Sequence, residues 1–165
     1  MIFVTVGAQM PFNRLVQAVD HWAHERGRDD VFAQIGLTDY RPKNIQWTPF
    51  LSTEEFNQRC EAANVIVAHA GTGSIITALQ LGKPILIMPR RANLRETRND
   101  HQVATSEQFR CFDSVLVAVD EKELITRLEG IHNLNARRAI EPYASHELLG
   151  VIREFIDDDN LHSSD

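Results

Sequence analysis

Cysteines and long apolar runs are both scarce in this chain, and each shortage excludes a class of protein. Cys60 and Cys111 are its only cysteines and lie far apart, so the sequence indicates neither a disulfide framework nor a thiolate metal site, and we expect a reducing compartment. The segment 1–6 is too short and too polar for a signal peptide, and no run reaches the apolar length that spans a bilayer. The sequence therefore predicts a cytoplasmic protein without a membrane span of its own.

Positive charge is also in short supply. The chain carries 17 Lys and Arg against 23 Asp and Glu, a formal net charge of −6, and it lacks a long basic tract. Because nucleic-acid binders usually present a cationic surface that displaces counterions, we expect no nucleic acid among its partners. A length of 165 residues with 43% hydrophobic content is typical of one globular domain, and we assign residues 1–165 to a single domain.

The segment 65–89 is the most informative part of the chain. An apolar run ends at His69, the small-residue turn Gly71-Thr72-Gly73-Ser74 opens a helix, and Gly82-Lys83-Pro84 stops that helix before a second apolar run. This order predicts a β-strand, α-helix, β-strand unit. Since glycines carry no side chain, an anion can approach the free N–H groups at the positive end of the helix, and the hydroxyl groups of the turn add donors. The alternative is a tight connection that binds nothing.

Two common nucleotide-binding motifs are absent from this turn. The dinucleotide-binding fingerprint requires a third glycine at position 76, where this chain has Ile76. The Gly-Lys-Ser or Gly-Lys-Thr ending of a P-loop is missing as well. NAD-binding proteins and ordinary NTPases are therefore disfavoured.

The rest of the chain continues the alternation of strands and helices. Patterning predicts strands at 2–6, 31–35, 45–47, 65–69, 85–88 and 115–119, with helices after Pro11, Ser52, Gly71, Asn99 and Asp120, and a loop at 89–99. This alternation predicts an α/β fold with a doubly wound, mainly parallel, Rossmann-like sheet, in which ligands bind beyond the carboxyl ends of the strands. Gly7 and Gly71 both end strands, so we expect the two glycine turns to line one cleft.

A further helix is expected near the C-terminus. It places one set of apolar residues on a single face: Leu148, Leu149, Ile152, Phe155 and Ile156. Residues 157–165 then form a frayed polar tail. The apolar face indicates either ordinary core packing or a surface for another subunit.

Several polar residues near the expected cleft allow two interpretations each. His69 is either a satisfied core histidine or a functional group beside the anion turn. Arg90, Arg91 and Arg95 belong either to a solvated loop or to a clamp for a diphosphate or for anionic lipid headgroups. The pair His101-Gln102 either helps to begin a helix or hydrogen-bonds sugar hydroxyls. Spacing alone does not separate these alternatives.

The motifs together resemble a known family. Residues 69–74, the Gly82-Lys83-Pro84 close, the His101-Gln102 pair, and Gly7 followed by Pro11-Phe12 are similar to the C-terminal, nucleotide-sugar-binding half of glycosyltransferase family 28. Within that family the chain resembles stand-alone donor-binding subunits of two-part UDP-sugar glycosyltransferases, of the bacterial exopolysaccharide or dolichol-pathway type. The likeness covers nearly the whole chain. It implies one half of a GT-B glycosyltransferase, in which two doubly wound domains face each other across a cleft.

The resemblance implies a role for each residue of the central turn. Gly71, Thr72, Gly73 and Ser74 would hold the diphosphate of the donor, and Gly7 would line the opposite wall of the site. The donor itself would be a UDP-sugar.

The resemblance also implies sugar and ribose contacts. His101 and Gln102 would contact the donor sugar or its ribose. The family commonly has a glutamate three residues after the serine of the turn, where it holds the ribose hydroxyls, and this chain has Thr77 there. The ribose contact therefore falls to Thr77 or to another residue.

The reaction implied by the resemblance is inverting transfer of a sugar to a lipid-linked acceptor, in exopolysaccharide or glycolipid synthesis. A base must deprotonate the acceptor hydroxyl, and preorganised donors must stabilise the leaving diphosphate. The base is expected on a membrane-anchored, acceptor-binding partner subunit, and within this chain His69 is the candidate. We expect neither a metal nor a cofactor, a position at the membrane only through the partner, and homodimers when the partner is missing.

Two other functions are compatible with the sequence. A non-catalytic regulatory module that binds nucleotide sugars would keep the anion turn and need no acceptor half. A stand-alone enzyme of the epimerase type usually has about two domains, and this chain is too short for that architecture.

Overall fold

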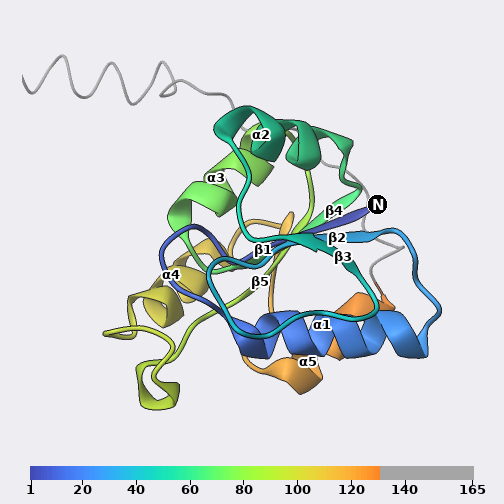
Figure 1. The fold of residues 1–165 in the computed structure, drawn as a ribbon. Coiled ribbons are helices and arrows are strands. Elements are labelled where there is room, and N and C mark those ends of the chain that lie inside the picture. Colours follow the sequence, from blue (N-terminus) through green and yellow to red (C-terminus); the bar gives the residue numbers. More distant parts are fainter. Residues whose placement is uncertain (131–165) are drawn as a thin grey trace, which may run out of the picture.

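The computed structural model describes residues 1–130 (Figure 1). The expected C-terminal helix with Leu148, Leu149, Ile152, Phe155 and Ile156, and the expected tail 157–165, lie outside the described residues. The assignment of 1–165 to a single domain stays a prediction. Within residues 1–130, no helix combines the length and apolar character that crossing a bilayer requires.

A six-stranded sheet forms the centre of the molecule, and its strands follow the order β3-β2-β1-β4-β5-β6. The strands are β1 (Ile2–Thr5), β2 (Val31–Gln34), β3 (Gln46–Thr48), β4 (Val65–His69), β5 (Ile85–Met88) and β6 (Val115–Val117). All five neighbouring pairs are parallel. The strand order reverses between β1 and β4, which is the position where open α/β sheets bind their ligands.

Helices cover both faces of the sheet. They are α1 (Asn13–Glu25), α2 (Thr53–Ala62), α3 (Thr72–Gln80), α4 (His101–Phe109) and α5 (Glu121–Glu129), with a short 3₁₀ helix at Ala92–Leu94. Helices α1 and α5 lie side by side below the sheet in Figure 1, and α2 and α3 lie above it. The predicted doubly wound, parallel, Rossmann-like fold is therefore confirmed.

The strands separate two apolar cores because successive side chains point to opposite faces of a sheet. Val4 of β1 packs in the core shared with α1 and α5, whereas its neighbour Phe3 packs in the core shared with α2 and α3. Val67 and Ile66 of β4 divide in the same way. Burial on both faces explains why these strands read as continuous apolar runs rather than as alternating ones.

Helix α2 begins as its sequence predicts. The Ser52 hydroxyl accepts a hydrogen bond from the backbone N–H of Glu55, and the Glu55 carboxylate accepts one from the backbone N–H of Ser52, which completes a capping box. Helix α5 begins differently. Asp120 accepts from the backbone N–H of Glu123, but the Glu123 carboxylate accepts from the backbone N–H of Val119 instead of that of Asp120.

Several predicted strand boundaries differ from the structure by one or two residues, and two departures from the prediction have a local cause. The last strand ends at Val117 rather than at residue 119, because the backbone N–H of Val119 turns to the Glu123 carboxylate. The predicted loop 89–99 contains one 3₁₀ turn, which ends at Arg95 in the left-handed backbone region with φ 57°. Both differences arise from local hydrogen bonds that apolar periodicity does not report.

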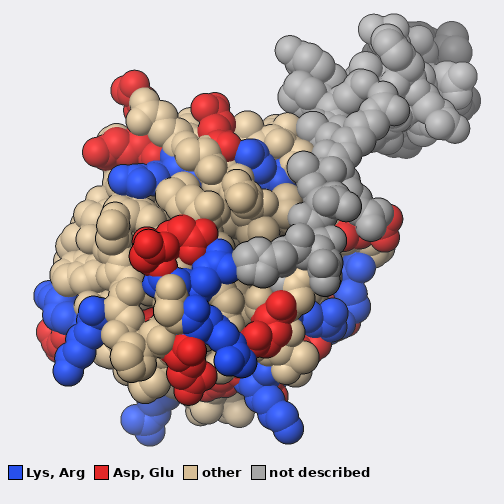
Figure 2. All heavy atoms as spheres, turned by 90° about the vertical axis from the view of Figure 1, so that its right-hand side faces the viewer, with Lys and Arg blue, Asp and Glu red and all other residues tan. Residues whose placement is uncertain are grey.

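Acidic and basic side chains are interspersed on the face drawn in Figure 2. The structure also contains exposed ion pairs, among them Arg26 with Glu129 at 2.7 Å. Pairs of this kind add little to stability because water screens them.

Asp20 of α1 is a buried carboxylate, only 3% exposed, that fixes the loop before β3. It accepts hydrogen bonds from the hydroxyl of Tyr40 at 2.8 Å and from the backbone N–H groups of Lys43 at 3.1 Å and Asn44 at 2.8 Å. Burial acts to raise the pKa of Asp20, but these hydrogen bonds outweigh burial, so the pKa is lowered.

Replacement of Asp20 by Asn should therefore lower the free energy of unfolding by about 2–3 kcal/mol, since buried backbone donors lose a charged acceptor. Tyr40→Phe, which removes one of the three hydrogen bonds, is the control and should cost about 1 kcal/mol. Urea denaturation measures both values.

The contribution of Asp20 also depends on pH. Because its pKa is lower in the folded chain, the stability that it provides is complete above the unfolded-state pKa of about 4 and is lost as the pH falls through the folded-state pKa. The difference between the wild-type chain and Asp20→Asn should shrink in acid. A difference that stays constant down to pH 2–3 would argue against this anchor.

Candidate functional site

Two glycine turns meet at the carboxyl edge of the sheet. Strands β1 and β4 pair in parallel with Thr5 opposite Ala68, so the turns that follow them lie at the same edge. The imidazole of His69 lies between these turns: a Cβ atom on Gly7 would be 2.8 Å from its Cε1 atom, and one on Gly71 would be 2.2 Å from its Nε2 atom. The expectation that the two turns are neighbours is confirmed. Both positions require glycine because a side chain there would overlap the histidine ring. The sequence alone did not reveal this requirement.

His69 is neutral at physiological pH. Burial lowers its pKa to about 4, and the positive charge of Arg90 acts in the same direction, while the backbone carbonyl of Thr5 acts against both. Its Nδ1 atom is buried and has no hydrogen-bond partner of normal geometry within residues 1–130. A neutral imidazole packed against two backbone turns keeps them in place, and its low pKa makes it a weak base.

The N-terminus of α3 is open to solvent. Its first residues, Thr72 and Gly73, are exposed, the N-cap residue is Gly71, no side chain caps the helix, and its first turn contains no acidic residue. In the described part of the chain, the backbone N–H groups of Thr72, Gly73 and Ser74 make no hydrogen bond. A Cβ atom on Gly73 would meet nothing within 4 Å. Free N–H groups and the helix dipole together give this end of α3 the properties of an anion site.

Thr77 lies one turn further along α3 and is half-buried. Its hydroxyl donates to the backbone carbonyl of Gly73 at 3.0 Å, a common arrangement for a threonine inside a helix. The proton of this hydroxyl is therefore engaged, and its oxygen keeps the capacity to accept a hydrogen bond.

The three arginines predicted as an anion clamp occupy different environments. Arg90 is 5% exposed, and its guanidinium lies over the ring of Phe12. Arg91 donates through Nη2 to the backbone carbonyl of Val119 at 2.6 Å. Arg95 is exposed at the end of the 3₁₀ turn. Backbone carbonyls hold the guanidinium groups of Arg90 and Arg91, and a role of the three arginines as an anion clamp stays a prediction.

Helix α4 brings His101 and Gln102 to the end of β5. The Oε1 atom of Gln102 accepts a hydrogen bond from the backbone N–H of Arg90 at 3.1 Å, which attaches the first turn of α4 to the strand end. His101 is the first residue of α4 and is exposed. Both residues lie at the carboxyl edge of the sheet, one strand further from β1 than the α3 turn.

A partly buried ion-pair network next to this edge was not predicted from the sequence. Arg14 of α1 donates to Glu96 at 2.7 Å and to Glu121 at 3.0 Å, and also to the backbone carbonyl of Pro89 at 3.1 Å. The network fixes the loop 89–99 against α1 and α5. Its members are 107 positions apart at most, and no local motif links them.

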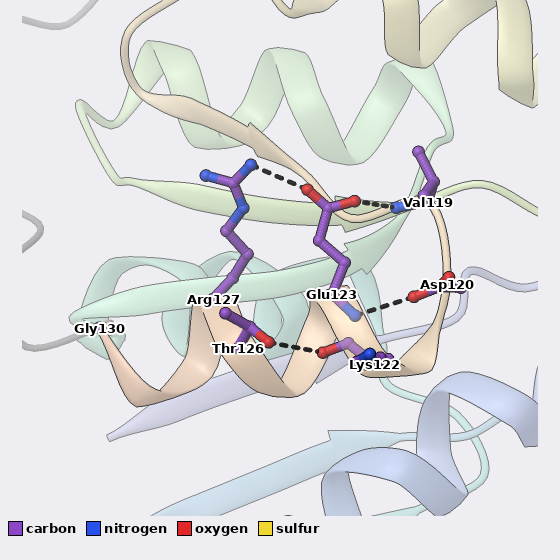
Figure 3. A pocket seen from close by; sticks show the side chains of 7 residues that line it. All are labelled: Val119, Asp120, Lys122, Glu123, Thr126, Arg127 and Gly130. Carbon is purple, nitrogen blue, oxygen red and sulfur yellow. Dashed lines mark hydrogen bonds and ion pairs between the residues drawn. The ribbon is translucent and has the colours of Figure 1, made fainter.

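The glycine turns line neither of two cavities found among the described residues. A cavity of about 450 Å³ opens at the same edge of the sheet, between Pro11 and Asn13 on one side and residues 37–41 on the other. The pocket of about 570 Å³ in Figure 3 lies along α5. There the carboxylate of Glu123 accepts hydrogen bonds from Arg127 and from the backbone N–H of Val119. The negative charge of Glu123 is therefore already paired with protein groups.

Comparison with known proteins identifies the family. The model of the glycosyltransferase family 28 C-terminal domain matches residues 1–146. The chain belongs to this family. Two curated relatives are both called UDP-N-acetylglucosamine transferase subunit ALG13: the Candida albicans protein is 30% identical over 74 residues, and the Yarrowia lipolytica protein is 25% identical over 124 residues. These alignments cover 45% and 66% of this chain but only 24% and 60% of the relatives, so this chain spans part of their length.

Solved structures share the fold. The solution structure of ALG13 matches with a TM-score of 0.59 at 18% identity and covers 92% of this chain and 93% of that chain. Several glycosyltransferases and UDP-N-acetylglucosamine 2-epimerases match with TM-scores of 0.55–0.57 at 12–18% identity, and this chain covers 34–45% of their lengths. The predicted fold, one half of a GT-B glycosyltransferase, is confirmed.

The described residues contain no group of three or more His, Cys, Asp or Glu side chains that could hold a metal ion. The expectation of a reaction without a metal or cofactor stays a prediction, as do the roles of the individual site residues.

The contact between His69 and the glycine turns is testable. Gly71→Ala should lower the free energy of unfolding by about 1–3 kcal/mol, because the new methyl group overlaps the imidazole and the core must shift. The matched control is Gly73→Ala, two residues away on the same turn, which should be neutral or stabilising by up to about 1 kcal/mol. Urea denaturation compares the two variants. If the free energies of unfolding of both variants equal that of the wild-type chain, His69 does not occupy this space.

Proposed function

We propose that this chain is the donor-binding subunit of an inverting glycosyltransferase, which takes a sugar from a UDP-sugar and acts together with an acceptor-binding partner. The observation that carries the proposal is the uncapped N-terminus of α3, which lies beside the Gly7 turn at the switch point of the sheet. Membership of glycosyltransferase family 28 supports it, as does the word subunit in the names of both curated relatives.

The diphosphate of the donor would bind at the start of α3. The backbone N–H groups of Thr72, Gly73 and Ser74 are free to donate, and hydrogen bonds to an ionised acceptor are stronger than those between neutral groups. The hydroxyl groups of Thr72 and Ser74 add donors. Gly7, in the turn after the neighbouring strand β1, would form the opposite wall, where its missing side chain leaves room for the ligand and for His69.

The sugar and ribose would extend from this point toward α4. His101 is exposed there, and the carboxamide nitrogen of Gln102 keeps its donors while its oxygen holds the backbone N–H of Arg90. The Thr77 oxygen can accept a hydrogen bond from a ribose hydroxyl. A single threonine oxygen is a weaker partner than a carboxylate, so ribose recognition by this chain would depend on additional contacts.

Catalysis would combine donor activation by this chain with base catalysis by the partner. As the bond between the sugar and the diphosphate breaks, negative charge builds up on the leaving group, and the preorganised N–H groups of α3 stabilise that charge. His69 has a pKa of about 4 and a buried Nδ1 atom, which makes it a poor general base at neutral pH. The base therefore belongs to the acceptor-binding subunit, which would hold a lipid-linked acceptor at the membrane.

Gly73→Asp should abolish the binding of UDP-sugars, because a carboxylate at this position repels the diphosphate and occupies its space. Isothermal titration with UDP-N-acetylglucosamine and other UDP-sugars measures the effect. Gln80→Glu adds the same charge at the exposed far end of α3 and should leave the dissociation constant within about twofold, since the charge is screened over this separation. Equal affinity of Gly73→Asp and the wild-type chain would refute the site.

The purified chain alone should bind a UDP-sugar and transfer almost nothing to a lipid-linked acceptor, since the base would be missing. Addition of the partner subunit should restore transfer. Release of UDP, followed with and without the partner, measures this difference. Efficient transfer by the single chain would contradict the proposal that the base lies on the partner. A chain that binds UDP-sugars but captures no partner subunit in a pull-down would favour a regulatory module.

A further inference from the structure

Arg90 is a buried cation that no carboxylate of the described residues 1–130 neutralises. It is 5% exposed, and its Nη2 atom donates to the backbone carbonyl of Val6 at 2.7 Å and to that of Met10. Within residues 1–130, Arg90 forms no salt bridge. The nearest acidic influence is Glu96, whose carboxylate is already bound by Arg14 and by the backbone N–H of Arg91.

The position of Arg90 connects it to the proposed donor site. It follows β5, and its two carbonyl partners lie at the end of β1 and in the loop after it, so its side chain ties the ends of two strands together. The positive charge of Arg90 also lowers the pKa of His69, which lies between the glycine turns. The Nε atom of Arg90 and the Nδ1 atom of His69 are both buried without a hydrogen-bond partner among the described residues.

An unneutralised buried charge is costly unless another charge compensates for it. Neutral carbonyl groups satisfy part of the hydrogen-bonding capacity of a guanidinium, but they carry no net negative charge. An anion at the neighbouring turn would lower the cost of burying Arg90, and Arg90 would raise the affinity for that anion by the same free energy. The arrangement therefore favours an anionic ligand over a neutral one.

We propose that Arg90 is a positioning residue of the donor site, which holds the loop after β1 through Val6 and Met10 and supplies the buried positive charge that a nucleoside diphosphate compensates. This inference rests on the proposed function and assigns Arg90 a role distinct from a surface clamp. The preference for a diphosphate over a monophosphate follows from this charge, because attraction grows with the negative charge of the ligand.

The test separates the charge of Arg90 from its hydrogen bonds. Arg90→Gln keeps a donor for the carbonyl groups and removes the charge, whereas Arg90→Lys keeps the charge and loses the planar fork. Arg110→Gln is the matched control, since Arg110 is exposed and forms an ion pair with Glu107 at the opposite end of α4. Isothermal titration gives the dissociation constants of UMP and UDP for each chain, and circular dichroism checks that each variant is folded.

Arg90→Gln should weaken UDP binding about tenfold or more and UMP binding by a smaller factor, because UDP carries more negative charge. Arg90→Lys should weaken both ligands by one similar, small factor, and Arg110→Gln should change neither. A purely structural role predicts instead that Arg90→Gln weakens UMP and UDP equally, and that result overturns the proposal. If Arg90→Gln does not fold, Arg90→Lys provides the test. A loss of affinity for UDP that is larger than the loss for UMP, although the positive charge is retained, also overturns the proposal.

The two proposals fail in different ways. A wild-type chain that binds neither UMP nor UDP refutes the proposed function, and this inference with it. A wild-type chain that binds UDP, together with an Arg90→Gln variant of equal affinity, refutes only the role of Arg90.

Discussion

The parallel pairing of β1 with β4 is the constraint on which the rest of the site depends. It brings two strand ends that are more than sixty positions apart to one edge of the sheet, and the His69 ring fills the space between the turns that follow them. Neither turn tolerates a side chain at its glycine facing that ring. The same packing leaves the first N–H groups of α3 uncapped, and these are the groups that we propose bind the diphosphate.

Two arginines, the half-buried Arg14 and the buried Arg90, extend this arrangement to the neighbouring loops. Arg14 connects α1 to the loop 89–99 through Glu96, and Arg90 connects the end of β5 to the loop after β1. They differ in their electrostatics. Arg14 lies between two carboxylates, whose hydrogen bonds outweigh the effect of burial and raise its pKa, whereas burial lowers the pKa of Arg90. The first is a closed ion-pair network, and the second leaves positive charge at the site where we propose that the donor's diphosphate binds.

Much of the fold could be predicted because its signals are local. Buried parallel strands read as apolar runs such as 65–68 and 85–88, and Ser52 with Glu55 marks the start of a helix. The environment of Arg90 could not be predicted in this way, since its partners Val6 and Met10 are 84 and 80 positions away. For the same reason, the sequence allowed Arg90 to belong either to a solvated loop or to an anion clamp and did not reveal that its side chain is buried. The packing of His69 between two glycines likewise depends on strand order, which spacing along the chain does not give.

Backbone amide shifts measured by NMR during titration with UDP test the central claim most directly, because they report on the N–H groups that we propose as ligands. The account predicts the largest shift changes at Thr72, Gly73 and Ser74, with smaller changes at Gly7 on the neighbouring turn. Saturable changes confined to the residues that line the pocket along α5, with the α3 amides unmoved, would contradict it.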